Sequence, residues 1–353
     1  MKFEHEVKRV SWNEELGQWI LQYVNLSVPN MEEQTQIFDI IINAPGALRI
    51  PLIPDQFEAF KGPTIHTAEW NHEIELKNKK VAVIGSGASA VQVIPSIVDS
   101  VETLHCYQRK PPYILPRAQC SFPGSVKFIF RHFPVVMRLF RYIIFTVHEL
   151  LYSAFRPGSL MYRLISRVSK AYRQNVLKNH KHLWDDLTPK YTIGCKRVIL
   201  SEQYYPAMAR PNVQLHTSPI DNIVDQTIYT KDGSKNEIDV LILATGFRVS
   251  DYFGPLEVIG KGGKNILKSW MDDRPRSYYG VSFCDTPNYF YLLGPNTVLG
   301  HNSVIFMIEC QVNFILNAIS EMMKRKAKVL NLKLSAEEEF MNQIDADMKT
   351  TVW

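Results

Sequence analysis

Six consecutive residues after a short apolar run have the types and spacing needed to hold a diphosphate. Gly85 and Gly87 stand directly after the apolar segment Val81–Ile84. Glycine at the first position allows a tight turn, and glycine at the second lets the backbone approach a pyrophosphate. Ala90 fills the third small position, where a helix packs against a strand. The pattern predicts a dinucleotide site formed by Gly85, Ser86, Gly87, Ala88, Ser89 and Ala90.

The elements on both sides of this turn are the ones that would position it. The apolar run before it reads as a strand, an apolar helical segment follows it, and a second strand-like run occupies Thr103–Tyr107. This order of strand, glycine turn, helix and strand is typical of a dinucleotide-binding unit in an α/β fold. The pyrophosphate would then lie on the unpaired amides at the N-terminus of the helix.

The residues after the second strand discriminate between the two nicotinamide cofactors. Units that bind NAD usually have an Asp or Glu roughly 20 residues past the glycines, where it holds the ribose 2′-hydroxyl. This chain has Gln108-Arg109-Lys110 there, with two adjacent cations and no carboxylate. Such a pair suits a 2′-phosphate, so the sequence favours NADP(H) over NAD. The alternative interpretation is a solvated basic turn.

The composition is that of an ordinary globular protein. The chain has 353 residues, long enough for two domains, with 46% hydrophobic and 21% charged residues. A formal net charge of +5 is too mild to indicate a nucleic-acid partner. The N-terminal residues do not read as a signal peptide, and no run of ~18 uncharged apolar residues predicts a spanning helix. We therefore expect a cytoplasmic protein.

The cysteines are typical of reduced thiols. They are widely spaced and odd in number, and no CxxC pair occurs, which argues against a local redox dithiol. A disulfide-type flavin reductase is therefore the least favoured class, and no metal site is assigned. The cysteines are Cys106, Cys120, Cys195, Cys284 and Cys310.

A basic, aromatic segment interrupts the predicted dinucleotide domain. This segment, Phe122–Trp184, is called the basic insertion here; it has helical apolar spacing and eleven Lys or Arg residues against one acid, Glu149. Two interpretations fit. Either the insertion makes peripheral contact with an anionic membrane surface, or its apolar face packs on its own protein while its cations are solvated.

Several motifs in order resemble one enzyme family. The segment FKGPTIHTAEW matches the FxGxxxHxxxW fingerprint of Baeyer–Villiger monooxygenases, relatives of the flavin-containing monooxygenases. The runs GSGASAVQ, YQRKPP, GCKR, ATGF and GPN follow in family order. Departures from the family pattern occur at Pro45, Asn71 and Lys110. The fingerprint match uses Phe60, Gly62, His66 and Trp70.

The resemblance implies an α/β fold with two nested Rossmann-like domains, for FAD and NADP(H), and a helical insertion. A partial FAD-binding domain would span 1–75. An NADP-binding domain would span 76–235, with the insertion at about 121–188, and 236–353 would return to the FAD-binding domain and end in a helix. No GxGxxG precedes residue 76, so the FAD domain is expected to be incomplete. The family pattern also continues past the last residue.

The resemblance also implies a reaction. In the family, NADPH reduces FAD, and the reduced flavin forms a C4a-peroxyflavin with O2. One oxygen atom then passes to a hydrophobic ketone or a soft heteroatom. By this match Arg197 is the catalytic cation, a role that suits a side chain protonated at any working pH. The alternative interpretation is a catalytically silent NADP-binding fragment.

The same match assigns the remaining residues. Lys196 would join Arg109 on the 2′-phosphate, and the fingerprint residues His66 and Trp70 would form a hinge that couples closure over NADPH to the flavin site. A surface role for the cations and a packing role for the fingerprint pair are the alternatives. Further cofactor contacts are expected from Thr245, Gly246 and Asn296.

Overall fold

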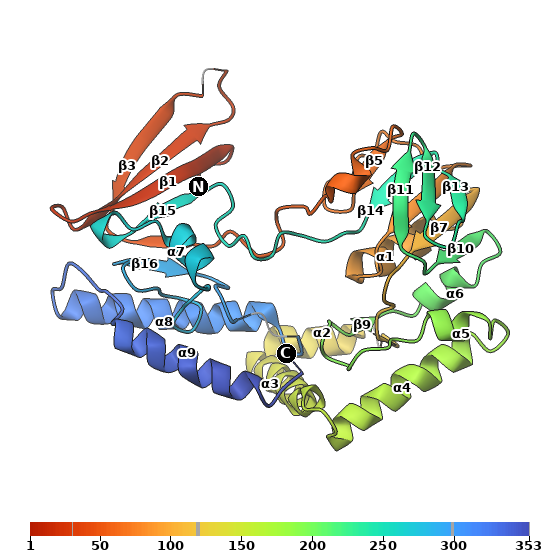
Figure 1. Ribbon diagram of the computed structural model, residues 1–353. Helices are drawn as coiled ribbons and strands as arrows, with labels where there is room; N and C mark the ends of the chain where they lie inside the picture. Colours follow the sequence, from red (N-terminus) through yellow and green to blue (C-terminus); the bar gives the residue numbers. More distant parts are fainter. Residues whose placement is uncertain (30, 118–120, 298–299, 353) are drawn as a thin grey trace. The chain divides into compact units, whose positions relative to one another are not determined.

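The chain folds into two compact units. The computed structural model describes residues 1–29, 31–117, 121–297 and 300–352 (Figure 1). Unit 1 comprises Met1–Ile50 and Arg248–Thr350, and unit 2 comprises Pro51–Phe247 and the final residues of the chain. Cys120 lies outside the described residues, and the other four cysteines are free thiols.

The unit boundaries differ from the domain boundaries expected from sequence. They fall after residues 50 and 247, whereas the sequence places domain boundaries after residues 75 and 235. Two strands account for the difference, because Thr64–His66 (β5) and Val240–Leu243 (β14) pair with each other in the sheet of unit 2. Which nucleotide each part of the chain binds stays a prediction.

A five-stranded parallel sheet forms the centre of unit 2 (Figure 1). Its strand order is β10-β7-β6-β14-β5. Parallel neighbours need crossover connections, and α1 connects β6 to β7. The predicted order of strand, turn, helix and strand is therefore confirmed. The remaining bounds are Lys80–Ile84 (β6), Ala88–Ile97 (α1), Thr103–Tyr107 (β7) and Val213–His216 (β10).

Both faces of this sheet are covered, which explains the continuous apolar runs of its central strands. Val81 and Val83 of β6 pack in one cluster with Ile94 of α1. Ala82 and Ile84 point to the opposite face, because successive side chains of a strand alternate. They share a cluster with residues of a small antiparallel sheet formed by Ile220–Val224 (β11), Thr227–Thr230 (β12) and Lys235–Glu237 (β13).

The basic insertion is helical, as its apolar spacing predicts. Pro134 begins α3, at a position where a helix needs no amide donor, and so separates α3 from α2. The helices are Gly124–His132 (α2), Pro134–Leu151 (α3), Tyr152–Phe155 (η2), Leu160–Val176 (α4) and Leu183–Asp186 (α5). Unit 2 also contains Asp55–Phe57 (η1), Ile114–Leu115 (β8), Ile199–Leu200 (β9) and Tyr204–Met208 (α6).

The helices of the insertion differ in how they pack. In α4, the Ser169 hydroxyl donates to the carbonyl of Ile114 at 2.9 Å, and the Tyr172 hydroxyl donates to the carbonyl of Ser201 at 3.0 Å. By contrast, none of the described residues in α2 or α3 is buried. Packing on its own protein therefore holds for α4, whereas most apolar side chains of α2 and α3 stay exposed.

The described residues of unit 1 form a mixed four-stranded sheet, three α-helices and one short 3-10 helix. The sheet order is β15-β1-β2-β3, and a separate parallel pair joins β16 to β4. The indole of Trp19 is fully buried and donates to the carbonyl of Pro287 at 2.6 Å. The bounds are His5–Asn13 (β1), Gln18–Asn25 (β2), Glu33–Phe38 (β3), Ile41–Asn43 (β4), Glu257–Ile259 (β15), Lys261–Gly263 (η3), Ile266–Asp272 (α7), Tyr289–Tyr291 (β16), Val304–Lys324 (α8) and Leu334–Met348 (α9).

One helix is long and apolar enough to span a membrane, although the sequence predicts no spanning helix. Among the described residues this is α8, whose most apolar window is 11% buried. The Ser303 hydroxyl caps it by accepting from the amide of Phe306 at 3.3 Å. One such helix is weak evidence for a span, because a core helix of a soluble protein can have the same composition.

A stack of three rings lies on the sheet of unit 2. His105 and His216 are stacked with their ring centroids 5.3 Å apart, and His105 Nδ1 lies 3.1 Å from His216 Nε2. The ring of Tyr107 stacks on that of His216, with the ring centroids 4.5 Å apart. Burial, reinforced by the neighbouring His216 and Lys80, lowers the pKa of His105 to about 4. The folded protein therefore favours the neutral form of this histidine.

We predict that unfolding becomes easier as the pH falls from about 6.5 toward 4. Since the unfolded chain binds the proton at the ordinary histidine pKa, the low folded pKa of His105 should cost about 3 kcal/mol of stability at pH 4. Chemical denaturation of the wild type and of His105→Gln across this range measures the effect. The variant should have the shallower pH dependence; equal slopes would contradict the prediction.

We also predict that Gly85→Ala lowers the free energy of unfolding by about 3 kcal/mol. Gly85 has a φ of +124°, and a Cβ there would lie 2.4 Å from the carbonyl oxygen of Ala244. Gly87→Ala is the matched control, since its φ is −76° and a Cβ would meet nothing within 4 Å. Thermal unfolding of both variants should separate them, and equal stabilities would contradict this account.

Candidate functional site

The glycine turn lies at the point in the sheet of unit 2 where the strand order reverses. From β6 the chain passes to β7 on one side, whereas β14 occupies the other side of β6. Ligands of open α/β sheets bind outside the carboxyl ends of the strands at such a point. The amide of Gly85 donates to the carbonyl of Tyr107 at 2.9 Å, so the turn is fixed to the end of β7.

The start of α1 is open to a ligand. Gly87 precedes the helix and provides no side-chain cap, and a Cβ there would meet nothing within 4 Å. The first amides of the helix therefore point toward an accessible space, which suits a phosphate. The hydroxyl of Ser86 donates to the carbonyl of Lys110 at 2.7 Å and ties the turn to the basic end of β7. Ala88, Ser89 and Ala90 form the first turn of α1.

Three cations from two distant stretches of sequence come together beside this turn. Arg109 and Lys110 follow β7, and Lys196 comes from the loop before β9. Burial lowers the pKa of Lys196, and the positive charges of Lys110 and Arg109 lower it further. Arg109 and Lys110 are exposed, and Lys196, although exposed as a whole residue, keeps the end of its side chain against the ring of Tyr191. The like charges that add to this lowered pKa place Lys196 near Lys110 and Arg109, and binding of the 2′-phosphate of NADP(H) by these residues stays a prediction.

The turn after β14 is held by the segment that enters unit 2. The amide of Leu52 donates to the carbonyl of Gly246 at 2.9 Å, and the hydroxyl of Thr245 donates to the carbonyl of Leu52. Gly246 has a φ of +89°, a conformation that favours glycine. The structure thus places Thr245 and Gly246 at the same edge of the sheet as the glycine turn.

The four fingerprint residues do not form one cluster. Phe60 is buried on the face of the sheet opposite α1, and a Cβ on Gly62 would lie 2.7 Å from its ring. His66 is buried at the carboxyl end of β5, and burial lowers the pKa of its imidazole. Trp70 packs against the core cluster that contains α1. These contacts give each residue a packing role in unit 2, and the hinge role stays a prediction.

Arg197 follows a constrained turn. Gly194 has a φ of +96°, and a Cβ there would lie 2.8 Å from the ring of Phe155, so the GCKR run needs glycine at its first position. The side chain of Arg197 is exposed beside Lys196 in the chain. Asn296, by contrast, belongs to unit 1, where its amide lies 3.6 Å from Met341 Sδ. The catalytic role of Arg197 and the cofactor contact of Asn296 are not tested by this geometry.

Two tyrosines near the cation cluster were not predicted as site residues. The ammonium of Lys196 lies 5.3 Å from the ring centroid of Tyr191, a cation–π distance that orients the lysine. The hydroxyl of Tyr113 in turn donates to the carbonyl of Tyr191 at 2.8 Å. Both lie in irregular segments, so no periodic pattern in the sequence marks them.

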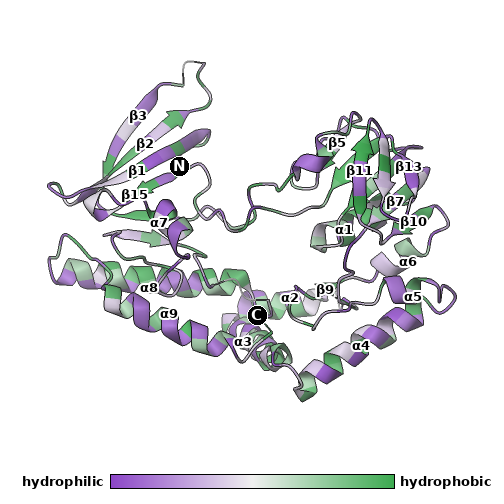
Figure 2. Ribbon diagram, viewed as in Figure 1, coloured by the Kyte–Doolittle hydropathy of each residue, from purple (hydrophilic) through white to green (hydrophobic). Residues whose placement is uncertain are grey.

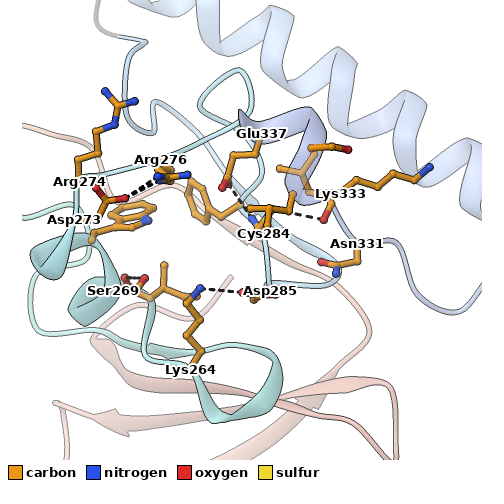
Figure 3. A pocket seen from close by; sticks show the side chains of 16 residues that line it. Lys264, Ser269, Asp273, Arg274, Arg276, Cys284, Asp285, Asn331, Lys333 and Glu337 are labelled. Carbon is orange, nitrogen blue, oxygen red and sulfur yellow. Dashed lines mark hydrogen bonds and ion pairs between the residues drawn. The ribbon is translucent and has the colours of Figure 1, made fainter. Parts of the chain in front are cut away.

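Unit 1 has a separate cavity of about 910 Å³ that contains none of the predicted site residues (Figure 3). Several of its charged groups already have partners. Lys264 pairs with Asp285 at 2.9 Å, and Arg276 pairs with Asp273 at 2.8 Å. The buried carboxylate of Glu337 accepts from the amide of Cys284 at 3.0 Å. Because these groups are engaged, the cavity offers no charge pattern that selects a ligand.

Comparison with known proteins agrees with the fold. A Baeyer-Villiger monooxygenase of Pseudomonas aeruginosa is 33% identical over 350 residues, covering 99% of this chain and 65% of that protein. The FAD-binding monooxygenase ktnD of Aspergillus niger is 33% identical over 349 residues, covering 97% of this chain and 57% of that protein. An open crystal structure of cyclohexanone monooxygenase is 25% identical with a TM-score of 0.84, covering 100% of this chain and 74% of that one.

These matches extend over nearly the whole chain and confirm the α/β class expected from its motifs. The chain spans 65% and 57% of the lengths of the two curated relatives. Residues 3–259 match the family described as flavin-binding monooxygenase-like, with its glycine turn, cation cluster and fingerprint segment inside the matched range. The chain belongs to the flavin-binding monooxygenase-like (FMO-like) family.

Proposed function

We propose that the protein is an FAD- and NADPH-dependent monooxygenase that inserts one oxygen atom from O2 into a hydrophobic ketone. The observation that carries the proposal is the meeting of Lys196 with Arg109 and Lys110 beside the glycine turn. The names of the relatives, Baeyer-Villiger, FAD-binding and cyclohexanone monooxygenase, favour a ketone over a soft heteroatom as substrate. The apolar character of the insertion favours a hydrophobic substrate.

In this proposal the residues at the carboxyl edge of unit 2 hold NADPH. The amides at the start of α1 bind the pyrophosphate, and the open space at Gly87 admits it. The three cations bind the 2′-phosphate, with Tyr191 orienting Lys196. His66 and Trp70 are retained as proposed hinge residues for closure over the cofactor.

For FAD, the described residues offer only part of a site. Thr245, Gly246 and Asn296 are the candidates for contact with it. A second unit like β6-α1-β7 would pair the strands before and after α7 with each other. In the described part of unit 1, β15 pairs with β1 and β16 pairs with β4 instead, so no such unit forms there. FAD supplies the oxygen-activating chemistry when bound. No step of the reaction is therefore assigned to FAD contacts of this chain.

The proposed contribution of Arg197 is a fixed positive charge for the oxygen that becomes negative during the reaction. A guanidinium stays protonated at any working pH and donates in a planar fork. In a site shielded from water such a charge stabilises a developing anion far more than it would in bulk solvent. Arg197 directly follows Lys196 in sequence, so one short segment would contact NADPH and also supply the positive charge for the oxygen transfer.

We predict that replacing Arg109 and Lys196 together by Ala raises the Kd for NADPH about a hundredfold, because each removes a charge-assisted contact. The Kd for NADH, which lacks the 2′-phosphate, should change by less than about twofold. Lys231→Ala, at an exposed residue in the turn between β12 and β13, is the matched control. Titration calorimetry with both nucleotides measures the effect. Equal weakening of NADPH and NADH binding would contradict the assignment.

We further predict that Arg197→Ala abolishes oxygenation and leaves NADPH oxidation running, with O2 reduced to hydrogen peroxide instead. Product formation should fall at least about a hundredfold, and Arg197→Lys should retain part of it because the charge remains. Ketone conversion by gas chromatography, beside NADPH and peroxide assays, provides the measurement. Both activities intact in Arg197→Ala would refute the role.

The comparison of Arg197→Ala with the wild type requires that the purified wild type contains flavin, which its absorbance band shows. A yellow preparation that consumes NADPH supports the monooxygenase. A colourless preparation that still binds NADPH would support the second candidate, a catalytically silent NADP-binding protein. The nucleotide titration above would succeed in either case, so the two proposals fail separately.

A further inference from the structure

The helix α3 carries a line of apolar side chains that remain exposed. Val135, Leu139, Ile143 and Leu150 are 73%, 59%, 50% and 64% exposed. Their spacing of four, four and seven residues places them on one face of the helix. We call these four residues the apolar stripe. An exposed contiguous stripe of this kind marks an interaction surface more often than an accident of composition.

The apolar stripe is not the seam between α2 and α3. That seam is aromatic, with the rings of Phe130 and Phe140 at 5.4 Å and those of Phe122 and Phe140 at 5.7 Å. At 100° per residue, Phe140 lies about 60° to 140° from the four stripe residues around the helix axis. The two helices therefore pack through this aromatic seam, while the four residues of the apolar stripe stay exposed. Figure 2 shows both hydrophobic and hydrophilic residues along α3.

The polar face of these two helices is strongly basic. Lys127 and Arg131 of α2 and Arg138 of α3 are exposed. The only acid of the two helices is Glu149. On α3, Arg138 falls outside the stripe, and its long side chain can extend along the helix toward the same boundary. The surface therefore combines an apolar strip with a positive border, as interfacial amphipathic helices do.

We propose that α2 and α3 dock on an anionic lipid surface. The apolar stripe enters the boundary between headgroups and acyl chains, and the cations contact lipid phosphates. The excess of cations over the single acid is complementary to anionic headgroups. A convex helix face without a groove suits a deformable bilayer better than a peptide. Docking depends on neither cofactor, so it stands apart from the proposed function.

The consequence for the proposed enzyme would be access to substrate. A hydrophobic ketone concentrates in a bilayer rather than in water. A protein held at the lipid surface by α2 and α3 would meet such a substrate at a higher local concentration. The insertion would then serve to bring the protein to its hydrophobic substrate, while the carboxyl edge of the sheet in unit 2 binds NADPH.

Vesicle co-sedimentation of the whole protein without nucleotide tests the docking. Vesicles of phosphatidylcholine alone are compared with vesicles of equal parts phosphatidylcholine and phosphatidylglycerol. Binding is expected to the anionic vesicles, and it should weaken as the salt concentration rises. Binding to neither kind of vesicle would overturn the proposal.

Two variants test the surface itself. Leu139→Gln should weaken binding about tenfold through lost apolar burial. Leu48→Gln, at a residue of unit 1 that is 63% exposed, is the matched control and should bind as wild type. Combined replacement of Lys127, Arg131 and Arg138 by Gln should weaken binding about fivefold per charge. Circular dichroism confirms that each variant is folded.

Two further outcomes would refute the assignment. If both the Leu139→Gln and the triple charge variant bind vesicles as wild type does, the lipid contact lies elsewhere. If sedimentation velocity shows a dimer that Leu139→Gln dissociates, while vesicles are not bound, the stripe is an interface between copies of the chain. Neither result depends on flavin content or NADPH binding.

Discussion

The close approach of Gly85 to the carbonyl of Ala244 is the constraint on which the site in unit 2 depends. An added Cβ would lie 2.4 Å from that oxygen, so only glycine lets the end of β6 pass the end of β14. The two strands are neighbours, yet the chain leaves β6 toward β7 on the other side. This divergence opens the sheet edge where Gly87 is exposed at the start of α1, the place where open α/β sheets bind their ligands. The positions of the turn, of α1 and of the strands β6 and β14 thus all depend on the absence of a side chain at Gly85.

The cations around this edge show how function and stability oppose each other. Lys196 has a lowered pKa because it is partly buried and lies near Lys110 and Arg109. Like charges in proximity destabilise the unliganded protein, while in the proposed function the same arrangement binds a dianion. The ring of Tyr191 and the tight turn at Gly194 fix the lysine despite this repulsion. A surface chosen for folding alone would separate these charges.

The basic insertion shows that one sequence pattern can have two structural outcomes. Both α3 and α4 are amphipathic and basic, and the sequence offered no means to separate them. In α4, Ser169 and Arg173 are buried, and the helix packs on the core of unit 2. In α3 most of the apolar residues stay exposed instead. The difference lies in what each helix meets in space, since hydrophobic periodicity indicates a face and not its partner.

The sequence by itself determined the strand–turn–helix unit and the family, while the preference for a 2′-phosphate at Arg109 stays a prediction. These depend on local backbone requirements and on motifs in order, which short stretches of residues encode. The tertiary structure decided which strands share a sheet, and hence the unit boundaries. It also decided that Lys196 meets residues far away in the sequence, and that Phe60 and His66 separate although one motif contains both. Contacts between distant residues depend on how the elements pack, and no local spacing of side chains specifies that packing.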